Sequence, residues 1–123
     1  MQLFGTDGIR SIAGEGPLVP EAVARVGRAV GETFLELGSG DTGTVVVGRD
    51  TRASGVSIAA RLAGGLKKAG MTPLDAGVVP TPAVSYLARS GSHALGLMVT
   101  ASHNPPQYNG IKVFTGCGTK ADE

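Results

Sequence analysis

Short apolar segments alternate along this chain with segments of helical periodicity, and that alternation limits the folds open to it. Strands are predicted at residues 44–47, 71–79 and 94–99, each a short run dominated by apolar side chains. Helices are predicted before, between and after the first two strands, where apolar residues recur at spacings of three and four. Parallel neighbouring strands need crossovers of this kind, so we expect an α/β layered domain with a largely parallel sheet.

Each predicted helix begins at a capping residue or a proline and ends at a glycine. These pairs are Pro20 and Gly38 for the first helix, Ser54 and Gly70 for the second, and Thr81 and Gly91 for the third. Gly70 is expected to adopt the left-handed conformation that closes many helices.

The end of the sequence predicts a reversal of the chain. Asn109 and Gly110 precede the apolar stretch Ile111 to Phe114, and Asn-Gly is a strong turn signal between apolar strands. We therefore expect the chain to turn back at these two residues into an antiparallel return strand. Lys112 would then lie at the same end of the sheet as the loop that follows residues 94–99.

That loop, Thr100 to Pro105, lies where open α/β sheets place their ligands. The Ser102 hydroxyl needs a base, a metal or a pre-installed phosphoryl group before it reacts, and the absence of a G-x-S-x-G elbow disfavours a hydrolase. Phosphoryl chemistry fits better, with charge from His103 and Lys112 near the transferring group. The alternative is a capped, solvated turn in which Ser102 and Asn104 bond the local backbone.

Composition excludes several other classes of function. The 123 residues fit one domain, and 11 basic and 10 acidic residues leave a net charge of +1, which favours neither nucleic acid nor a membrane as partner. No long apolar run occurs, so we expect a cytoplasmic protein. Cys117 is the single cysteine, which excludes an internal disulfide and a thiolate metal cluster.

Several segments together resemble one enzyme family. Thr100 to Pro105 resembles the phosphoserine loop of the α-D-phosphohexomutases, and Phe4 to Arg10 resembles their amino-terminal signature. Residues 48–52, 81–84 and 109–112 also stand as in that family. The opening and residues 81–87 are most similar to its phosphoglucosamine mutase branch, with the phosphomannomutase and phosphoglucomutase branches as alternatives. Ser11 departs from the signature's usual glycine, and a serine fits there unless φ is positive.

The resemblance implies a three-layer α/β/α domain with a mixed, largely parallel sheet. Residues 1–123 would be domain I of a four-domain phosphohexomutase, truncated at its carboxyl end, with domains II–IV absent. Ser102 would carry the phosphoryl group that interconverts glucosamine 6-phosphate and glucosamine 1-phosphate through a bisphosphorylated sugar. His103 would sit beside that group, Lys112 would assist proton transfer or neutralise charge, and Arg10 would serve a similar purpose.

The resemblance also implies cofactors and partners. Mg²⁺ would be held by the phosphate on Ser102 and by an Asp-x-Asp-x-Asp loop that this sequence lacks. Asp7 and Asp50 are conceivable helpers, although their spacing does not make a metal site. A sugar 1,6-bisphosphate would act as activator. The partners would be a phosphosugar substrate and the remaining mutase domains, and a homodimer stays open. Arg49 and Arg52 would either support the active-site loops or form a surface charge network with Asp50.

Three hypotheses about the chain as a whole follow. The first is a fragment of a full-length mutase, inactive by itself. The second is a naturally short binding or regulatory module of the same fold. The third is a small phosphatase using Ser102, which is disfavoured because no water-activating group or metal cluster accompanies the serine.

Overall fold

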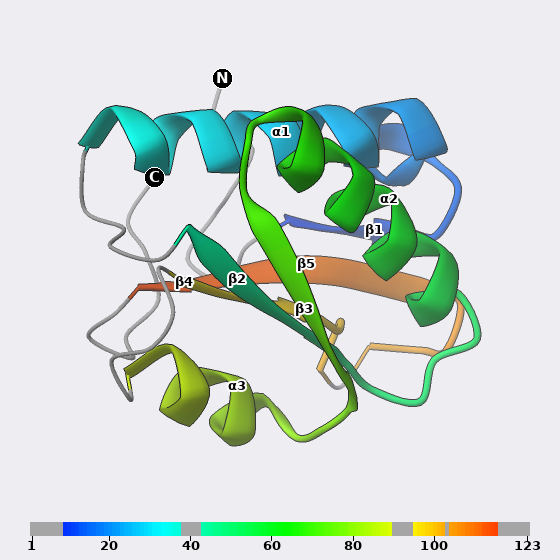
Figure 1. Ribbon diagram of the computed structural model, residues 1–123. Helices are drawn as coiled ribbons and strands as arrows, with labels where there is room; N and C mark the ends of the chain where they lie inside the picture. The colour runs from blue at the N-terminus through cyan, green and yellow to red at the C-terminus, as the bar shows by residue number, and fades with distance from the viewer. Residues whose placement is uncertain (1–8, 38–42, 90–94, 103, 116–123) are drawn as a thin grey trace.

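The computed structural model describes residues 9–37, 43–89, 95–102 and 104–115. The helices and strands in this part of the chain are β1 (Ile9–Ile12), η1 (Gly16–Leu18), α1 (Pro20–Leu37), β2 (Thr44–Arg49), α2 (Gly55–Lys68), β3 (Thr72–Val78), α3 (Thr81–Arg89), β4 (Leu95–Val99) and β5 (Tyr108–Thr115). Helices α1 and α2 cover one face of the sheet and α3 covers the other (Figure 1). The predicted three-layer α/β/α architecture is therefore confirmed.

The sheet has the strand order β1-β5-β4-β2-β3. Strand β2 pairs in parallel with both β3 and β4, whereas β5 runs antiparallel between β4 and β1. Four of the five described strands consequently point the same way, and the prediction of a mixed, largely parallel sheet is correct. The edge strand β1 was not predicted, because its four residues carry no strand pattern apart from their pairing with β5.

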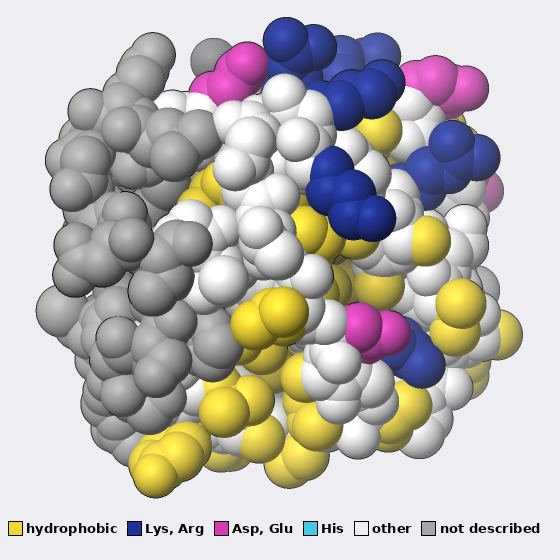
Figure 2. Space-filling model, in the orientation of Figure 1, with side chains coloured by type: hydrophobic (Ala, Val, Ile, Leu, Met, Phe, Trp, Pro, Cys, Tyr) yellow, Lys and Arg dark blue, Asp and Glu magenta, His cyan; other side chains and the backbone are white. Residues whose placement is uncertain are grey.

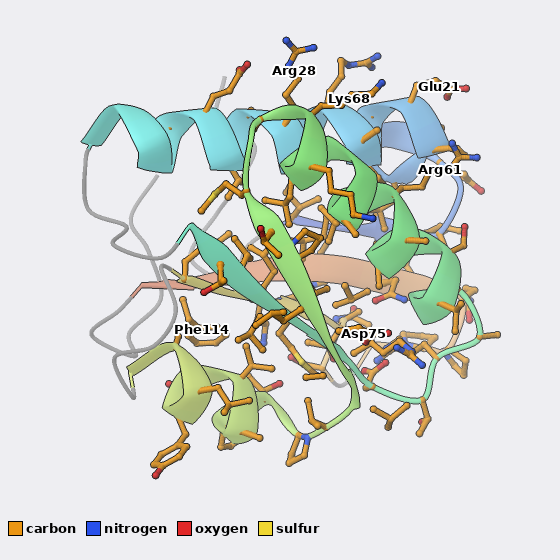
Figure 3. The ribbon with its side chains drawn as sticks, viewed as in Figure 1. Glu21, Arg28, Arg61, Lys68, Asp75 and Phe114 are labelled. Carbon is orange, nitrogen blue, oxygen red and sulfur yellow. The ribbon has the colours of Figure 1, made fainter. Side chains whose placement is uncertain are left out.

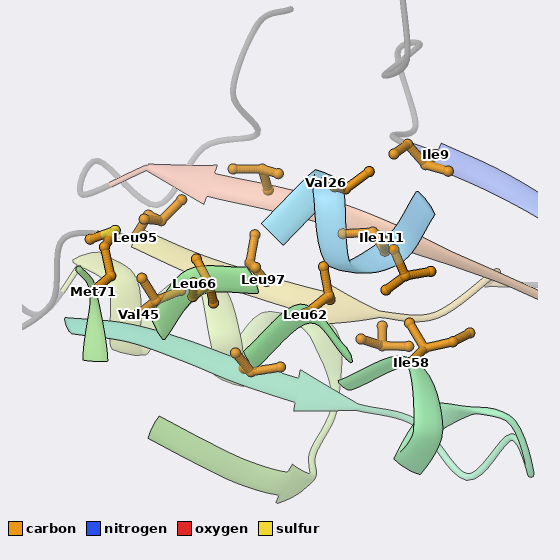
Figure 4. Packing of buried hydrophobic residues seen from close by; sticks show 14 of the residues in the cluster. Ile9, Val26, Val45, Ile58, Leu62, Leu66, Met71, Leu95, Leu97 and Ile111 are labelled. Carbon is orange, nitrogen blue, oxygen red and sulfur yellow. The ribbon is translucent and has the colours of Figure 1, made fainter. Parts of the chain in front are cut away.

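The larger core lies between the sheet and the helix pair α1 and α2. Ile58, Leu62 and Leu66 recur every four residues along α2 and turn inward, and Leu62 and Leu66 are completely buried. They meet alternate residues of the central strands, such as Val45 and Leu97 (Figure 4). Each buried side chain of this size contributes roughly 1.5–3 kcal/mol. This face supplies most of the apolar burial of the domain.

Helices α1 and α2 approach each other closely at Gly65. A Cβ added there would contact the Ala24 carbonyl oxygen and lie 2.7 Å from the Arg28 nitrogen, so only glycine lets the two backbones meet. The outer surface of the pair is basic (Figure 2), with exposed Arg25, Arg28, Arg61, Lys67 and Lys68. Among the described residues, no helix combines the length and the apolar character needed to cross a bilayer.

The opposite face of the sheet carries a smaller core beneath α3. Val84 and Ala88 of α3 pack on Met98 of β4 and Phe114 of β5. Figure 3 shows Phe114 between the sheet and α3. Strand β4 is buried along its whole length because helices cover both of its faces.

Most of the predicted boundaries agree with the structure to within two residues. Strand β2 runs to Arg49 because Gly48 and Arg49 still pair with β4. Helix α2 follows Ser54 as predicted, but the Ser54 side chain makes no capping hydrogen bond. Gly70 has φ +95°, which confirms the left-handed closure. The predicted stops at Gly38 and Gly91 lie outside the described residues.

The predicted turn at Asn109 and Gly110 is wrong, although the antiparallel return strand is correct. Both residues lie inside β5, and the chain reverses before them, where the Tyr108 nitrogen donates to the Pro105 carbonyl at 3.0 Å. Asn109 is fully buried, and its side-chain nitrogen donates to Ser54 Oγ at 2.8 Å. A Cβ on Gly110 would contact the Ile9 carbonyl oxygen, so this glycine permits close packing of strands.

Candidate active site

The candidate site is built on the loop that joins β4 to β5. Thr100 follows the carboxyl end of β4, and it is buried at 6% exposure. The neighbouring parallel strand β2 ends beside it, where the Asp50 nitrogen donates to the Val99 carbonyl at 3.2 Å. The loop therefore starts where two parallel strands end together, as predicted from the sequence.

Ser102 has an unusual backbone conformation. Its φ is +55°, and it is the one non-glycine residue with positive φ in the described part of the chain. The left-handed region costs an L-residue roughly 1–2 kcal/mol, so neighbouring contacts must hold the serine there. One of them is the hydrogen bond from the Ser102 nitrogen to Thr100 Oγ1, at 3.0 Å. The side chain itself is exposed at the loop tip.

The structure brings Lys112 and Ser102 together. Lys112 Nζ donates a hydrogen bond to Ser102 Oγ at 2.7 Å. Ile111 and Val113 belong to the core under α1 and α2, and side chains alternate along a strand, so Lys112 projects to the other face. A hydroxyl beside an ammonium can release or accept a proton, and negative charge on the oxygen is stabilised there.

Arg10 and His103 complete the predicted set. Arg10 is an exposed residue of β1 and lies opposite Gly110 of β5. Directly opposed residues share a face of the sheet, so Arg10 lies on the same face as Lys112. His103 lies outside the described residues. Ser11 has no positive φ, so its departure from the family signature is accommodated; its hydroxyl donates to the Glu15 carbonyl at 3.3 Å.

Arg52 binds the loop far more extensively than the sequence indicated. Its side chain is 10% exposed, and its guanidinium donates five hydrogen bonds. The acceptors are Asp50 Oδ2 at 3.1 Å and the carbonyl oxygens of Ser102 at 2.8 Å, Asn104 at 3.0 Å, Pro105 at 2.8 Å and Tyr108 at 3.1 Å. Arg49, in contrast, pairs with Asp75 at 3.3 Å. Of these two arginines, Arg52 is the one that hydrogen-bonds the described residues of the loop.

Asp50 links the two sides of the loop. Its Oδ2 accepts from Thr100 Oγ1 at 2.5 Å as well as from Arg52, and its Oδ1 accepts from the Arg52 backbone nitrogen at 3.1 Å. No role was predicted for Thr100, and Asp50 was expected in a charge network or as a helper at a metal site. Both are polar residues at the ends of neighbouring strands, and that shared position is the signal that could have found them.

The described residues do not form a Mg²⁺ site by themselves. No group of three or more His, Cys, Asp or Glu side chains converges in the part of the chain that the structure describes. The Asp50 carboxylate beside the loop already accepts hydrogen bonds from Arg52 and Thr100. A phosphoryl group on Ser102 would add the oxygen ligands that Mg²⁺ prefers, but further ligands would have to come from elsewhere.

Comparison with known families identifies this arrangement. Residues 1–123 match the family described as phosphoglucomutase/phosphomannomutase, alpha/beta/alpha domain I. The chain belongs to this family. The match confirms the family predicted from the sequence, and it covers the strands, helices and loop described above.

Members of the phosphoglucomutase/phosphomannomutase family with curated names are similar over almost the whole chain. Phosphoglucosamine mutases from Burkholderia lata and Rhodococcus jostii are 45% and 47% identical over 95% and 99% of this chain. The one from Koribacter versatilis is 48% identical over 99%. The chain spans about a quarter of the length of these relatives, 27% for the first two.

Solved structures of family members have the same fold. A candidate phosphomannomutase from Thermus thermophilus has a TM-score of 0.85 and 39% identity, over 96% of this chain and 26% of that one. A phosphoglucomutase/phosphomannomutase family protein from Burkholderia thailandensis has a TM-score of 0.79 and 36% identity, over 97% of this chain and 27% of that one.

Proposed function

We propose that Ser102 carries a phosphoryl group for a mutase that interconverts glucosamine 6-phosphate and glucosamine 1-phosphate through a bisphosphorylated sugar. The observation that carries this proposal is the 2.7 Å hydrogen bond from Lys112 Nζ to Ser102 Oγ, in a loop at the carboxyl end of the sheet. The choice of sugar is supported by the relatives named phosphoglucosamine mutase.

In the first transfer, the bond between phosphorus and Ser102 Oγ breaks, and a bond forms between phosphorus and the free hydroxyl oxygen of the sugar phosphate. That hydroxyl loses its proton to solvent, and Oγ gains one. Lys112 stabilises the negative charge that develops on the departing Oγ and can deliver the proton through its hydrogen bond. In the second transfer, the bond between phosphorus and the sugar oxygen at the other end of the bisphosphate breaks, and a bond forms between that phosphorus and Oγ. Lys112, now neutral, removes the Oγ proton, and the released sugar oxygen takes a proton from solvent to become the free hydroxyl.

The remaining assignments extend this proposal. Arg10 would neutralise charge on the phosphates from the face that it shares with Lys112, and His103 would lie beside the transferring group. When bound, Mg²⁺ would supply positive charge to the phosphoryl oxygens, with the phosphate on Ser102 as one ligand. A sugar 1,6-bisphosphate would phosphorylate Ser102 at the outset. Residues 1–123 would be domain I, and domains II–IV would complete the site.

A phosphomannomutase or phosphoglucomutase activity is the second candidate, because the similar solved structures carry those names. In either case the isolated 123 residues are expected not to turn over a sugar phosphate. A cytoplasmic location and a homodimer stay predictions.

The test is Ser102→Ala in the complete protein, with glucosamine 6-phosphate, Mg²⁺ and glucosamine 1,6-bisphosphate. Turnover should fall by at least about 1,000-fold because the carrier atom is gone. Folding should be unchanged, because an exposed loop hydroxyl buries little apolar area. Mass spectrometry should map one phosphoryl group to Ser102 in the unmodified protein. Ser57→Ala, at an exposed serine of α2, is the matched control. Near-normal turnover of Ser102→Ala would contradict the proposal.

A further inference from the structure

We infer that Arg52 is a positioning residue: held by Asp50, it fixes the backbone of Ser102 for phosphoryl transfer without touching the transferred group. The inference rests on the proposed function of Ser102. It assigns a separate task to a residue that contributes no side-chain atom to the hydrogen bond between Ser102 and Lys112.

The guanidinium of Arg52 has no donor left for a phosphate. An arginine side chain offers five N–H donors in a planar fork. Nε donates to Asp50, Nη1 to the carbonyls of Pro105 and Tyr108, and Nη2 to those of Ser102 and Asn104. A sugar phosphate could bind this group only by breaking bonds to the loop. The contacts therefore favour a role in holding the loop over a role in binding substrate.

The contacts of Arg52 complement those that the loop makes by itself. Among the described residues of the loop and the first residue of β5, the Asn104 nitrogen donates to the Ala101 carbonyl at 3.1 Å and the Tyr108 nitrogen to the Pro105 carbonyl. The guanidinium adds a donor to three carbonyl oxygens of the loop, those of Ser102, Asn104 and Pro105, and to that of Tyr108 at the start of β5. Removing the guanidinium would take one donor away from each of these four carbonyls.

Both peptide groups that flank the Ser102 Cα are tied to the same carboxylate. The Ser102 nitrogen donates to Thr100 Oγ1, which donates to Asp50 Oδ2. The Ser102 carbonyl accepts from Arg52 at 2.8 Å, and Arg52 Nε donates to the same Oδ2. Together with Ser102, these hydrogen bonds form a closed ring through Thr100, Asp50 and Arg52. The ring explains how a serine keeps φ +55° at an exposed loop tip. It also fixes the direction of the Ser102 Cα–Cβ bond, while the hydrogen bond from Lys112 holds Oγ.

Lysine could not reproduce this arrangement. Its ammonium is a compact charge with three donors, whereas the acceptors around Arg52 are spread over a carboxylate and four carbonyls. Arg52→Lys therefore keeps the positive charge but loses the fork. The variant therefore tests whether the loop needs the donor geometry of arginine or only its positive charge.

The kinetic test compares Arg52→Lys and Arg52→Ala with the unmodified complete protein, in the mutase assay described above. A loosened loop misplaces Oγ, so kcat should fall by about 100-fold in Arg52→Lys, while KM should change less than about threefold. Added guanidinium should restore part of the kcat of Arg52→Ala in a saturable way, and should not do so for Ser102→Ala. Arg28→Ala, at an exposed arginine of α1, is the control and should retain normal kcat.

The structural test is amide hydrogen exchange in the same proteins. Arg52→Lys should speed exchange at the Asn104 and Tyr108 amides and leave the amides of β4 unchanged. Unchanged exchange in the loop would overturn the inference whatever the activity. Faster exchange with normal kcat, or a raised KM with normal kcat, would also overturn it. If the unmodified protein neither turns over sugar phosphate nor accepts a phosphoryl group on Ser102, the proposed function fails, and hydrogen exchange still decides whether Arg52 holds the loop.

Discussion

Arg49 and Arg52 are three residues apart, but they lie in two regions of the molecule that differ in side-chain burial and in hydrogen bonding. At the loop end of the sheet, Arg52 is 10% exposed and donates five hydrogen bonds. At the β3 edge, Arg49 is 20% exposed and pairs with Asp75, which is 73% exposed (Figure 3). The two arginines therefore differ in role because their acceptors differ: Arg52 is surrounded by fixed backbone carbonyls and a half-buried carboxylate, whereas Arg49 has one exposed carboxylate.

The β3 edge is open in other respects. A hollow of about 310 Å³ lies between α2 and β3, and Val56, Ala60 and Pro73 are among the residues that line it. Leu74 and Val78 of β3 are 40% and 55% exposed. Side chains have room to move there, so substitutions at this edge should cost little. The loop end should be the less tolerant region.

The largest effect is expected for Gly110→Ala at the loop end. The added Cβ would contact the Ile9 carbonyl oxygen and lie 2.9 Å from that of Thr100, and both are backbone atoms that cannot turn aside. Stability should fall by about 3 kcal/mol or more, measured by chemical denaturation of the complete protein. Gly64→Ala on α2 is the control, because a Cβ there meets nothing within 4 Å, and it should not destabilise. Equal stability of the two variants would contradict the comparison.

An intermediate effect is expected for Asp50→Ala. The carboxylate accepts hydrogen bonds from the backbone and side chain of Arg52 and from Thr100, and the substitution leaves those donors without an acceptor. The loss should be about 2 kcal/mol in the same measurement, with faster hydrogen exchange in the loop. Asp50→Asn keeps the shape of the side chain but not its charge. Its stability should lie between those of Asp50→Ala and the unmodified protein. A loss of stability below about 0.5 kcal/mol would show that the ring of hydrogen bonds around Ser102 does not stabilise the domain.

The smallest effect is expected for Arg49→Ala at the β3 edge. Its partner Asp75 is mostly exposed, and pairs of this kind are worth at most about 1 kcal/mol. Stability should therefore change by less than that amount, and kcat should stay within about threefold of normal. A loss as large as that of Asp50→Ala would remove the distinction between the two regions.

Local patterns predicted most of the fold. The apolar stripe of α2, the glycine that closes it and the proline that opens α1 act over a few residues, and a reader of the sequence can see all of them. Asn109 and Gly110 show the limit of such reasoning. An Asn-Gly dipeptide fits either a tight turn or a strand position where two backbones pack closely. Here the Ile9 carbonyl makes it the second, and Ile9 lies far away along the chain.

The candidate site was predicted in part for a similar reason. Ser102 and Lys112 were expected at one end of the sheet, and the structure joins them by a hydrogen bond, although the chain reverses earlier than predicted. The hydrogen bonds from Arg52 to the loop could not be predicted, because four of its acceptors are backbone carbonyls, which every residue carries. Arg10 reaches the shared face only through the pairing of β1 with β5.

The pairing of β1 with β5 has a consequence for the order in which the domain can be completed during synthesis. Of the described strands, β1 leaves the ribosome first, but its partner β5 leaves last, and Ile9 pairs with Ile111. Strands β2, β3 and β4 and their helices can associate while the chain is still growing. The amino-terminal segment that holds Arg10 has no sheet partner until β5 emerges. The nascent chain therefore carries β1 without its β5 partner until the segment from β2 to β5 has been synthesised.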